Sequence, residues 1–171
     1  GQSRNISNTN ELLGNLDGVY GIKTGFTNGA NRCLVTGCKR GNLDIITVVL
    51  GADTKKLRTE NSIKLIEYAY KNYEIVNLKE KIEEQFEKWR QLNERRIYIN
   101  KGKNKQIQLQ LQELKYPEMA IKSTQKDNVV IEINSLYYLE SPVKENEVVG
   151  SAKIQLQGKT IATLDIMTKE E

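Results

Sequence analysis

Two β-branched, apolar runs follow one another in this chain and constrain its fold more than any other feature. Residues 32–39 (RCLVTGCK) and 43–50 (LDIITVVL) are separated only by Arg40-Gly41-Asn42. Runs of this length and composition are typical of strands, and so short a connection indicates a hairpin. Residues 17–25 (DGVYGIKTG), with three glycines, predict a short strand before them. The sequence therefore predicts three sequential antiparallel strands.

A helix is expected directly after these strands. Asp53-Thr54 are residue types that commonly cap helices, so the helix begins there and runs to about Tyr73. One face of it should pack on the sheet, because apolar side chains recur near a 3.6-residue period at Leu57, Ile63, Ile66, Tyr70 and Tyr73. Residues 45–50 (IITVVL) are apolar on both faces, which predicts a central strand covered on both sides.

The composition changes beyond Val76. Residues 79–96 contain 11 charged residues in 18 and neither Gly nor Pro. Local periodicity there favours a solvated helix with a sparse apolar stripe of Ile82, Phe86, Trp89 and Leu92. From Arg96 onward, short alternating apolar segments separated by turn signals predict a small antiparallel β-sandwich. The predicted fold class is α+β.

Composition excludes several classes of function. Lys and Arg number 26 against 22 Asp and Glu, and this net charge of only +4 argues against nucleic-acid binding. Histidine is absent, which removes His-based triads and most zinc sites. A strand would point Cys33 and Cys38 to opposite faces, so no disulfide is expected. No apolar run approaches the ~18 residues of a membrane span, and no signal segment opens the chain. Neither a metal nor a cofactor is expected.

Residues 21–27 (GIKTGFT) are the heptad most informative about chemistry. They do not form a phosphate-binding loop, because such a loop has Gly directly before its Lys, and here Ile22 separates Gly21 from Lys23. The remaining interpretations are a plain turn and a Lys-Thr-Gly segment on an edge strand.

On an edge strand, Lys-Thr-Gly offers an ammonium, a hydroxyl and a bare backbone side by side. That set suits a substrate that ends in a carboxylate. Lys23 would supply a fixed positive charge, while Thr24 and Thr27 would donate hydrogen bonds. Gly25 would let a peptide backbone approach closely. A lone tripeptide of this kind is most often a turn, so the flanking residues carry the weight.

The flanking residues match one known family. They are Asn8-Thr9-Asn10 with Leu12-Leu13, the K-T-G strand with Thr27, the strands at Cys33-Leu34 and 48–51, and Arg58 with the helix to Tyr73. This region resembles the last part of the penicillin-binding domain of low-molecular-mass penicillin-binding proteins, the serine-type D-alanyl-D-alanine carboxypeptidases of peptidase family S11. Later segments resemble the β-rich C-terminal domain of the same enzymes at 138–143 (YLESPV), 148–150 and Gly158-Lys159.

The resemblance divides the chain into two domains. Residues 1–76 would be the C-terminal part of the transpeptidase-like domain, and 77–171 the C-terminal β-rich domain. The chain departs from the family at Asn31, where Gly is usual. The family also builds the region of 79–96 largely as strand, and we take strand as the expectation there, against the local periodicity.

The resemblance also implies a reaction. In this family a serine attacks the penultimate D-Ala carbonyl of a peptidoglycan stem peptide, the terminal D-Ala leaves, and water releases the acyl-enzyme. Lys23 would hold the electrostatics of the site, and Thr24 and Thr27 would bind the terminal carboxylate. The Phe26 amide would be an oxyanion-hole donor. Arg58 would add positive charge near the carboxylate, or it could equally be a helix-surface ion-pair partner.

Only one of the three family motifs is convincing in this chain. Ser123-Thr124-Gln125-Lys126 and Ser141-Pro142-Val143-Lys144 match Ser-x-x-Lys, but lie among β segments instead of at the start of a buried helix. Ser3-Arg4-Asn5 matches Ser-x-Asn but lies too close to Lys23. We therefore expect a C-terminal piece of a longer enzyme, inactive alone, whose exposed strands associate into a dimer.

The resemblance implies partners and a location as well. The full enzyme would act on peptidoglycan and β-lactams in the extracytoplasmic bacterial cell envelope, with any membrane anchor outside this chain. An alternative is that the β-rich half is a non-catalytic interaction or spacer module. A β-lactamase is a weaker alternative, because such enzymes do not usually carry that domain.

Overall fold

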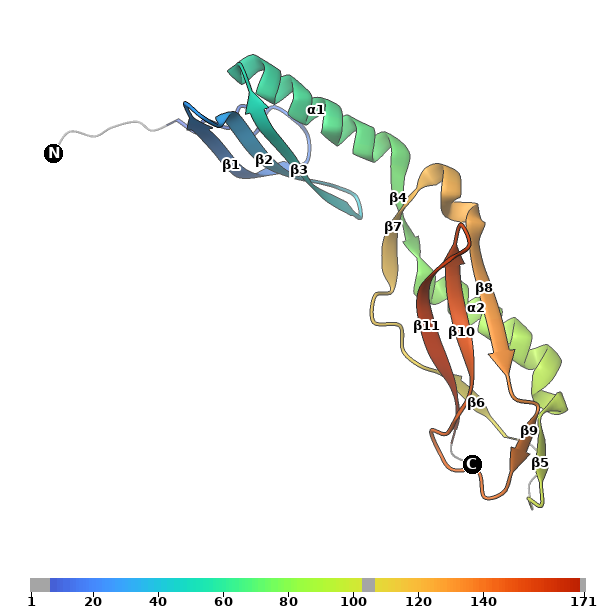
Figure 1. Ribbon diagram of the computed structural model, residues 1–171. Helices are drawn as coiled ribbons and strands as arrows, with labels where there is room; N and C mark the ends of the chain where they lie inside the picture. The colour runs from blue at the N-terminus through green and yellow to red at the C-terminus, as the bar shows by residue number, and fades with distance from the viewer. Residues whose placement is uncertain (1–6, 103–106, 170–171) are drawn as a thin grey trace. The chain divides into compact units, whose positions relative to one another are not determined.

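The computed structural model describes residues 7–102 and 107–169. The chain divides into two compact units, Gly1–Ile75 and Val76–Glu171 (Figure 1). Each unit has its own hydrophobic core. The identity of the two regions as the domains named above stays a prediction at this point. Helix and antiparallel strand occur together, so the predicted α+β class is confirmed.

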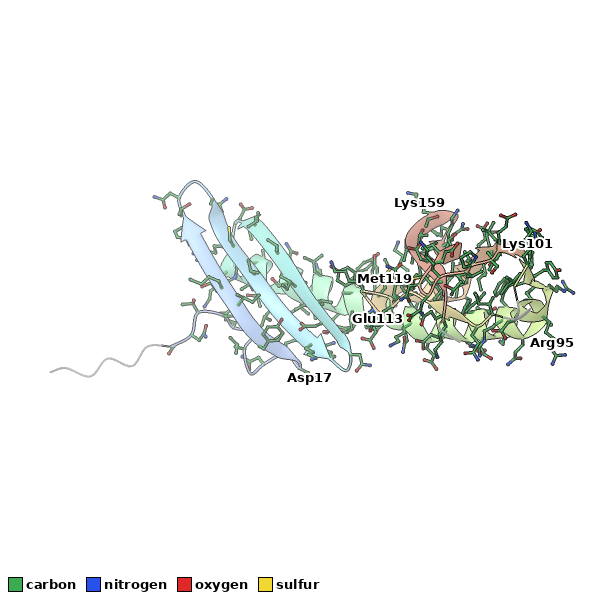
Figure 2. The ribbon with its side chains drawn as sticks, turned by 90° about the horizontal axis from the view of Figure 1, so that it is seen from below. Asp17, Arg95, Lys101, Glu113, Met119 and Lys159 are labelled. Carbon is green, nitrogen blue, oxygen red and sulfur yellow. The ribbon has the colours of Figure 1, made fainter. Side chains whose placement is uncertain are left out.

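The first unit is a three-stranded antiparallel sheet with one helix on it. Its strands are β1 (Val19–Thr27), β2 (Asn31–Arg40) and β3 (Leu43–Ala52), in the spatial order β1-β2-β3. The helix α1 (Lys55–Asn72) covers one face, and Figure 2 looks onto the opposite face with α1 behind the strands. The three predicted strands and the predicted helix are thus confirmed. The core between sheet and helix contains Leu12, Leu34, Cys38 and Ile66.

Local sequence explains the boundaries of these elements. The Thr54 hydroxyl accepts a hydrogen bond from the Leu57 amide at 3.0 Å, so Thr54 caps α1 as expected. Asn31 has a φ of 51°, the left-handed region that glycine adopts freely and asparagine tolerates better than most residues. The substitution of Asn for the usual Gly is therefore compatible with the turn that precedes β2.

The prediction that residues 45–50 form a central strand covered on both sides is wrong for the described residues. The central strand is β2, and β3 lies at an edge. Its side chains alternate between the α1 face and an open face, where Ile46, Val48 and Leu50 are 64%, 53% and 71% exposed. We call these three side chains the open apolar face.

The second unit begins within β4 (Tyr73–Asn77). The helical elements that follow are α2 (Leu78–Asn93), the 3-10 turn Glu94–Arg96 and the 3-10 turn Ser123–Asn128. The strands are β5 (Tyr98–Asn100), β6 (Leu109–Leu111), β7 (Glu118–Lys122), β8 (Val129–Ser135), β9 (Tyr138–Glu140), β10 (Val148–Leu156) and β11 (Lys159–Thr168). A four-stranded antiparallel sheet in the order β6-β11-β10-β8 is joined by the two-stranded sheets β4-β7 and β5-β9.

The expectation of strand at 79–96 is wrong, because residues 78–93 form the helix α2. The Asn77 side chain caps it by accepting from the Glu80 amide at 3.0 Å. Ile82 and Phe86 are buried in the core with the sheet, and α2 thus supplies part of the layer that was expected from strands alone. Local periodicity indicated this correctly, except at Leu92, which is exposed. Neither α1 nor α2, the α-helices of the described residues, is long and apolar enough to cross a membrane.

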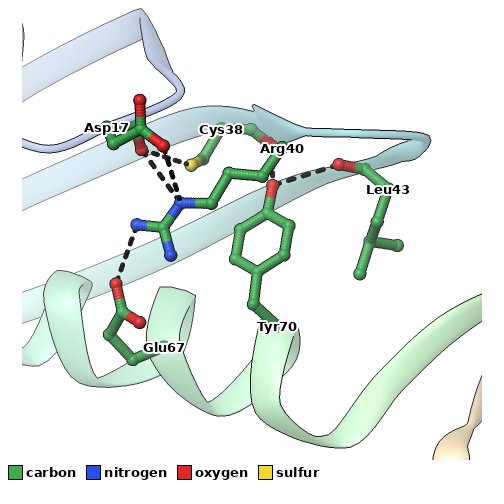
Figure 3. A network of polar contacts seen from close by, with 6 residues as sticks. All are labelled: Asp17, Cys38, Arg40, Leu43, Glu67 and Tyr70. Atoms are coloured by element: carbon green, nitrogen blue, oxygen red, sulfur yellow. Dashed lines mark hydrogen bonds and ion pairs between the residues drawn. The ribbon is translucent and has the colours of Figure 1, made fainter.

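A polar network fastens the β2–β3 hairpin to α1 (Figure 3). Arg40 donates to the Glu67 carboxylate at 2.8 Å and to the Asp17 carbonyl at 3.1 Å, and its guanidinium lies 4.7 Å from the Tyr70 ring centre. The Tyr70 hydroxyl has two backbone acceptors, the carbonyls of Cys38 at 2.7 Å and Leu43 at 3.1 Å. Burial, followed by the neighbouring Cys38 thiol, raises the pKa of Tyr70 to about 12.

This network predicts an alkaline limit to stability. The folded pKa of Tyr70 lies above its ordinary value of 10, so its contribution is complete below pH 10 and is lost as the pH rises toward 12. Tyr70→Phe should cost about 1 kcal/mol at neutral pH, for one hydrogen bond, and should flatten the decline above pH 10. Urea unfolding followed by circular dichroism measures both effects. The exposed Tyr68 supplies the control Tyr68→Phe, and equal behaviour of the two variants would contradict the assignment.

Candidate active site

The K-T-G residues lie on β1, which has a paired strand on one side only among the described residues. Lys23, Thr24 and Gly25 are opposite Val35, Leu34 and Cys33 of β2. An edge strand leaves alternate backbone N–H and C=O groups unpaired along its outer side. The expected edge position of the motif is therefore present.

Alternation along β1 divides the motif between the two faces of the sheet. Thr24 pairs with Leu34, which is completely buried in the core beneath α1, so the Thr24 side chain lies on the α1 face. Lys23 and Gly25 lie on the other face. A ligand at the outer edge of β1 can meet side chains of both faces and the free backbone groups between them.

The Lys23 ammonium is held close to the strand. Its Nζ donates a hydrogen bond to the Thr24 carbonyl oxygen at 2.7 Å, and the side chain is exposed to solvent. A carbonyl group fixes the position of the ammonium but leaves its charge uncompensated. Lys23 is therefore suited to attract an anion.

Thr27 and Phe26 close the motif at the end of β1. The Thr27 hydroxyl accepts from the Ala30 amide at 3.0 Å, which orients its oxygen and leaves its own proton free to be donated. The Phe26 ring is 58% exposed and carries the Arg32 guanidinium 4.8 Å from its centre. A second positive charge thus lies at this end of the strand.

Arg58 is not a surface residue, and the interpretation as a helix-surface ion-pair partner is contradicted by its burial. The side chain is 3% exposed. Its Nη2 donates to the Thr9 carbonyl at 3.4 Å, and its Nε is buried without a hydrogen-bond partner in the described structure. Because this buried guanidinium has so few hydrogen-bond partners, its positive charge raises the electrostatic potential beside the Thr24 face of β1.

One further residue, Thr9, belongs to this site, although no local sequence pattern predicts it. Thr9 quoted within Asn8-Thr9-Asn10 was assigned no role, yet its hydroxyl lies 2.7 Å from the Thr24 hydroxyl. The distance in sequence, 15 residues, is what hid the contact. The match of Asn8-Thr9-Asn10 to the family was the available signal.

An acidic side chain also approaches this region. Glu11 accepts hydrogen bonds from Lys55 at 2.6 Å and Thr59 at 3.1 Å. These bonds, first that of Lys55, hold the pKa of the Glu11 carboxyl below its usual value, and the charge of Arg58 acts in the same direction. The Glu11 carboxylate is therefore hydrogen-bonded to two side chains of α1 and stays ionised beside the site.

The other serine patterns lack the expected setting. Ser123 begins the exposed 3-10 turn Ser123–Asn128, and Ser141 lies in a bend just after β9. Neither is at the start of a buried α-helix. Ser3-Arg4-Asn5 lies outside the described residues. No group of His, Cys, Asp and Glu that could hold a metal occurs in the described parts of the chain.

The second unit contains an apolar pocket of about 570 Å³. Its walls come from the start of α2, the segment before β7, the start of β7 and the first half of β11. They include Leu78, Leu114, Met119, Ile161 and Leu164. Glu113 and Met119, both labelled in Figure 2, belong to this lining. The size is within the range of pockets that hold small ligands or side chains of a partner.

Comparison with known proteins places this geometry in a class. Residues 2–54 match the family model for D-alanyl-D-alanine carboxypeptidase, and residues 91–171 match that for the penicillin-binding protein 5 C-terminal domain. A carboxypeptidase of Bacillus subtilis is 29% identical over 97% of this chain, and one of Escherichia coli is 30% identical over 95%. The chain spans 40% and 38% of the length of these two relatives.

Solved structures of carboxypeptidases and penicillin-binding proteins share the fold of this chain. The carboxypeptidase of Francisella tularensis matches with a TM-score of 0.61 at 25% identity, covering 95% of this chain and 38% of that one. Penicillin-binding protein 5 of Haemophilus influenzae shares the fold, with a TM-score of 0.58 at 23% identity, over 96% of this chain and 45% of that one. These matches together support a penicillin-binding protein of low molecular mass as the class of this chain. The chain belongs to the D-alanyl-D-alanine carboxypeptidase family within that class.

Gly25 provides a test of the site that is independent of activity. A Cβ added there would meet only Cys33 Cβ, at 3.6 Å, which is an ordinary contact. Gly25→Ala should therefore change the free energy of unfolding by less than about 0.5 kcal/mol in urea titrations. Gly18→Ala is the matched contrast, because Gly18 has a φ of 78° and its added Cβ would lie 2.5 Å from the Lys39 carbonyl. A large loss at Gly25 would mean that the fold, and not a ligand, requires glycine there.

Proposed function

We propose that this chain is the part of a serine D-alanyl-D-alanine carboxypeptidase that binds the terminal carboxylate of the substrate. The observation that carries the proposal is the K-T-G motif on β1, at an edge of the sheet that the described residues form, with Lys23 accessible and the Thr24 face backed by the buried Arg58. The family assignment supports it. The whole protein would remove the terminal D-Ala from peptidoglycan stem peptides.

The residues of this chain would act on the anionic end and the reacting carbonyl. Thr24 and Thr27 would donate hydrogen bonds to the carboxylate, and Lys23 would supply positive charge and orient the serine and lysine contributed by the rest of the protein. The Phe26 amide would donate to the oxyanion that forms when serine attacks. Gly25 would leave room for the peptide backbone of the substrate.

Arg58 would act at longer range. Because its guanidinium is buried and only weakly hydrogen-bonded, its field reaches the carboxylate site with less screening than that of a surface arginine. Its role would be to increase affinity for an anionic substrate without touching it. Glu11 opposes this only in part, because Lys55 already compensates its charge.

A penicillin label tests the enzymatic proposal. The complete protein should form a covalent adduct with a fluorescent penicillin, visible after denaturing electrophoresis, and Lys23→Ala should slow labelling about 100-fold or more, as loss of a main electrostatic group does. The 171-residue chain alone should remain unlabelled, since none of its Ser-x-x-Lys patterns has the required setting. A labelled band from this chain would contradict the assignment of the nucleophile to the rest of the protein.

Association through the sheet is a second expectation for the isolated chain. The open apolar face would be covered by the same face of another copy, or the edge of β3 would pair between copies. Multi-angle light scattering should then give twice the 19.5 kDa of one chain. Val48→Lys should return it to a monomer, whereas a monomeric unsubstituted chain at high concentration would rule the dimer out.

The partners and location follow from the same proposal. The complete enzyme would act on peptidoglycan stem peptides and be acylated by β-lactams, outside the cytoplasmic membrane in the cell envelope. Any membrane anchor would lie outside this chain. No cofactor is required, because serine acyl transfer with a lysine partner needs neither a metal nor an imidazole.

A non-catalytic role for the second unit is the alternative favoured by one observation. The apolar pocket near β11 would suit an interaction or spacer module that holds a partner of the cell envelope. This role is compatible with the enzyme in the same protein. A complete protein that never reacts with penicillin would leave the interaction module as the better proposal. A β-lactamase is less favoured, because the match extends over the C-terminal domain.

A further inference from the structure

Thr9 contacts two of the residues proposed to act on the substrate carboxylate, Thr24 and Arg58. Its hydroxyl lies 2.7 Å from that of Thr24 on β1, and its carbonyl accepts a hydrogen bond from Arg58 of α1 at 3.4 Å. Thr9 itself belongs to neither element. It therefore bridges the hydroxyl and the guanidinium from a separate segment of the chain.

The segment around Thr9 is held firmly in place. The Asn10 side chain is 5% exposed, and it donates to the Gly21 carbonyl at 3.4 Å and accepts from the Leu12 amide at 3.1 Å. Leu12 is 2% exposed and belongs to the core of the first unit. The backbone at Thr9 is thus anchored to β1 and to the core by its neighbours, without help from its own hydroxyl.

The Thr9 hydroxyl is exposed, so structural need does not explain its contact with Thr24. An exposed hydroxyl can exchange one partner for water at little net cost. Each of the two hydroxyls has a single proton, so only one of them can donate in the contact between Thr9 and Thr24. If Thr24 donates to Thr9, no Thr24 proton remains for a ligand. If Thr9 donates to Thr24, the Thr24 proton is free.

We infer that Thr9 is a positioning residue that directs the proton of Thr24 toward the substrate carboxylate. A carboxylate only accepts hydrogen bonds, so its arrival selects the arrangement in which Thr9 donates to Thr24 and Thr24 donates to the anion. Two hydrogen bonds in series polarise one another and strengthen the second. The inference deepens the proposed function and rests on it.

The test uses the complete carboxypeptidase and two synthetic peptides. One is an N-acylated D-Ala-D-Ala peptide with a free terminal carboxylate, and the other is its C-terminal amide. Thr9→Val should lower kcat/KM for the free acid about three- to tenfold, the effect of one hydrogen bond of modest net strength, and change the amide less than about twofold. Thr9→Ser, which keeps the hydroxyl, should restore most of the activity. Thr160→Val, on the exposed end of β11, is the matched control.

Coupling with Thr24 completes the experiment. If Thr9 acts through Thr24, adding Thr9→Val to Thr24→Val should cause no further loss for the free acid. Equal losses on the acid and the amide, a full further loss in the Thr24→Val background, or no loss at all would each overturn the inference. An unsubstituted enzyme that does not react with penicillin would overturn the proposed function, and this inference with it. An active enzyme that is indifferent to Thr9→Val would overturn the inference alone.

Discussion

Antiparallel pairing between β1 and β2 is the constraint on which the site depends. It runs from Val19 opposite Cys38 to Thr27 opposite Asn31 and holds the K-T-G residues in extended backbone. Extended backbone sends Lys23 and Thr24 to opposite faces, and the edge position makes the groups of both faces reachable from one side. A helical or irregular segment of the same composition would not offer a charge, a hydroxyl and free amides along one line.

The packing of α1 against the sheet adds a buried positive charge to the site. α1 covers only the face that carries Thr24. Arg58 of α1 is buried on that face and is linked to Thr24 by Thr9, which contacts both residues. Positive charge is therefore present in two forms, an accessible ammonium at Lys23 and a guanidinium shielded from water. The two differ in their response to salt, since buried charges are screened less than exposed ones.

Most of the first unit could be predicted from sequence because local signals agree there. β-branched runs, the Thr54 cap and the period of α1 all indicate the observed elements. The environment of β3 could not be predicted, because an apolar pattern does not reveal whether a partner covers it. For residues 79–96 the local periodicity predicted the observed helix, whereas the family resemblance predicted strand. The helix forms because Asn77 caps its first turn and because Ile82 and Phe86 are buried on one face. The role of Thr9 could not be predicted, because a contact between residues 15 apart in sequence leaves no local pattern.

The stacking of the only tryptophan has an optical consequence. Trp89 lies in α2 with its ring 6.0 Å from that of Phe86, partly buried against the core of the second unit, and the first unit has no tryptophan. Emission excited at the red edge of the aromatic band therefore comes from the second unit alone. Tryptophan fluorescence therefore follows the melting of the second unit alone, whereas circular dichroism follows the loss of ordered backbone in both units together.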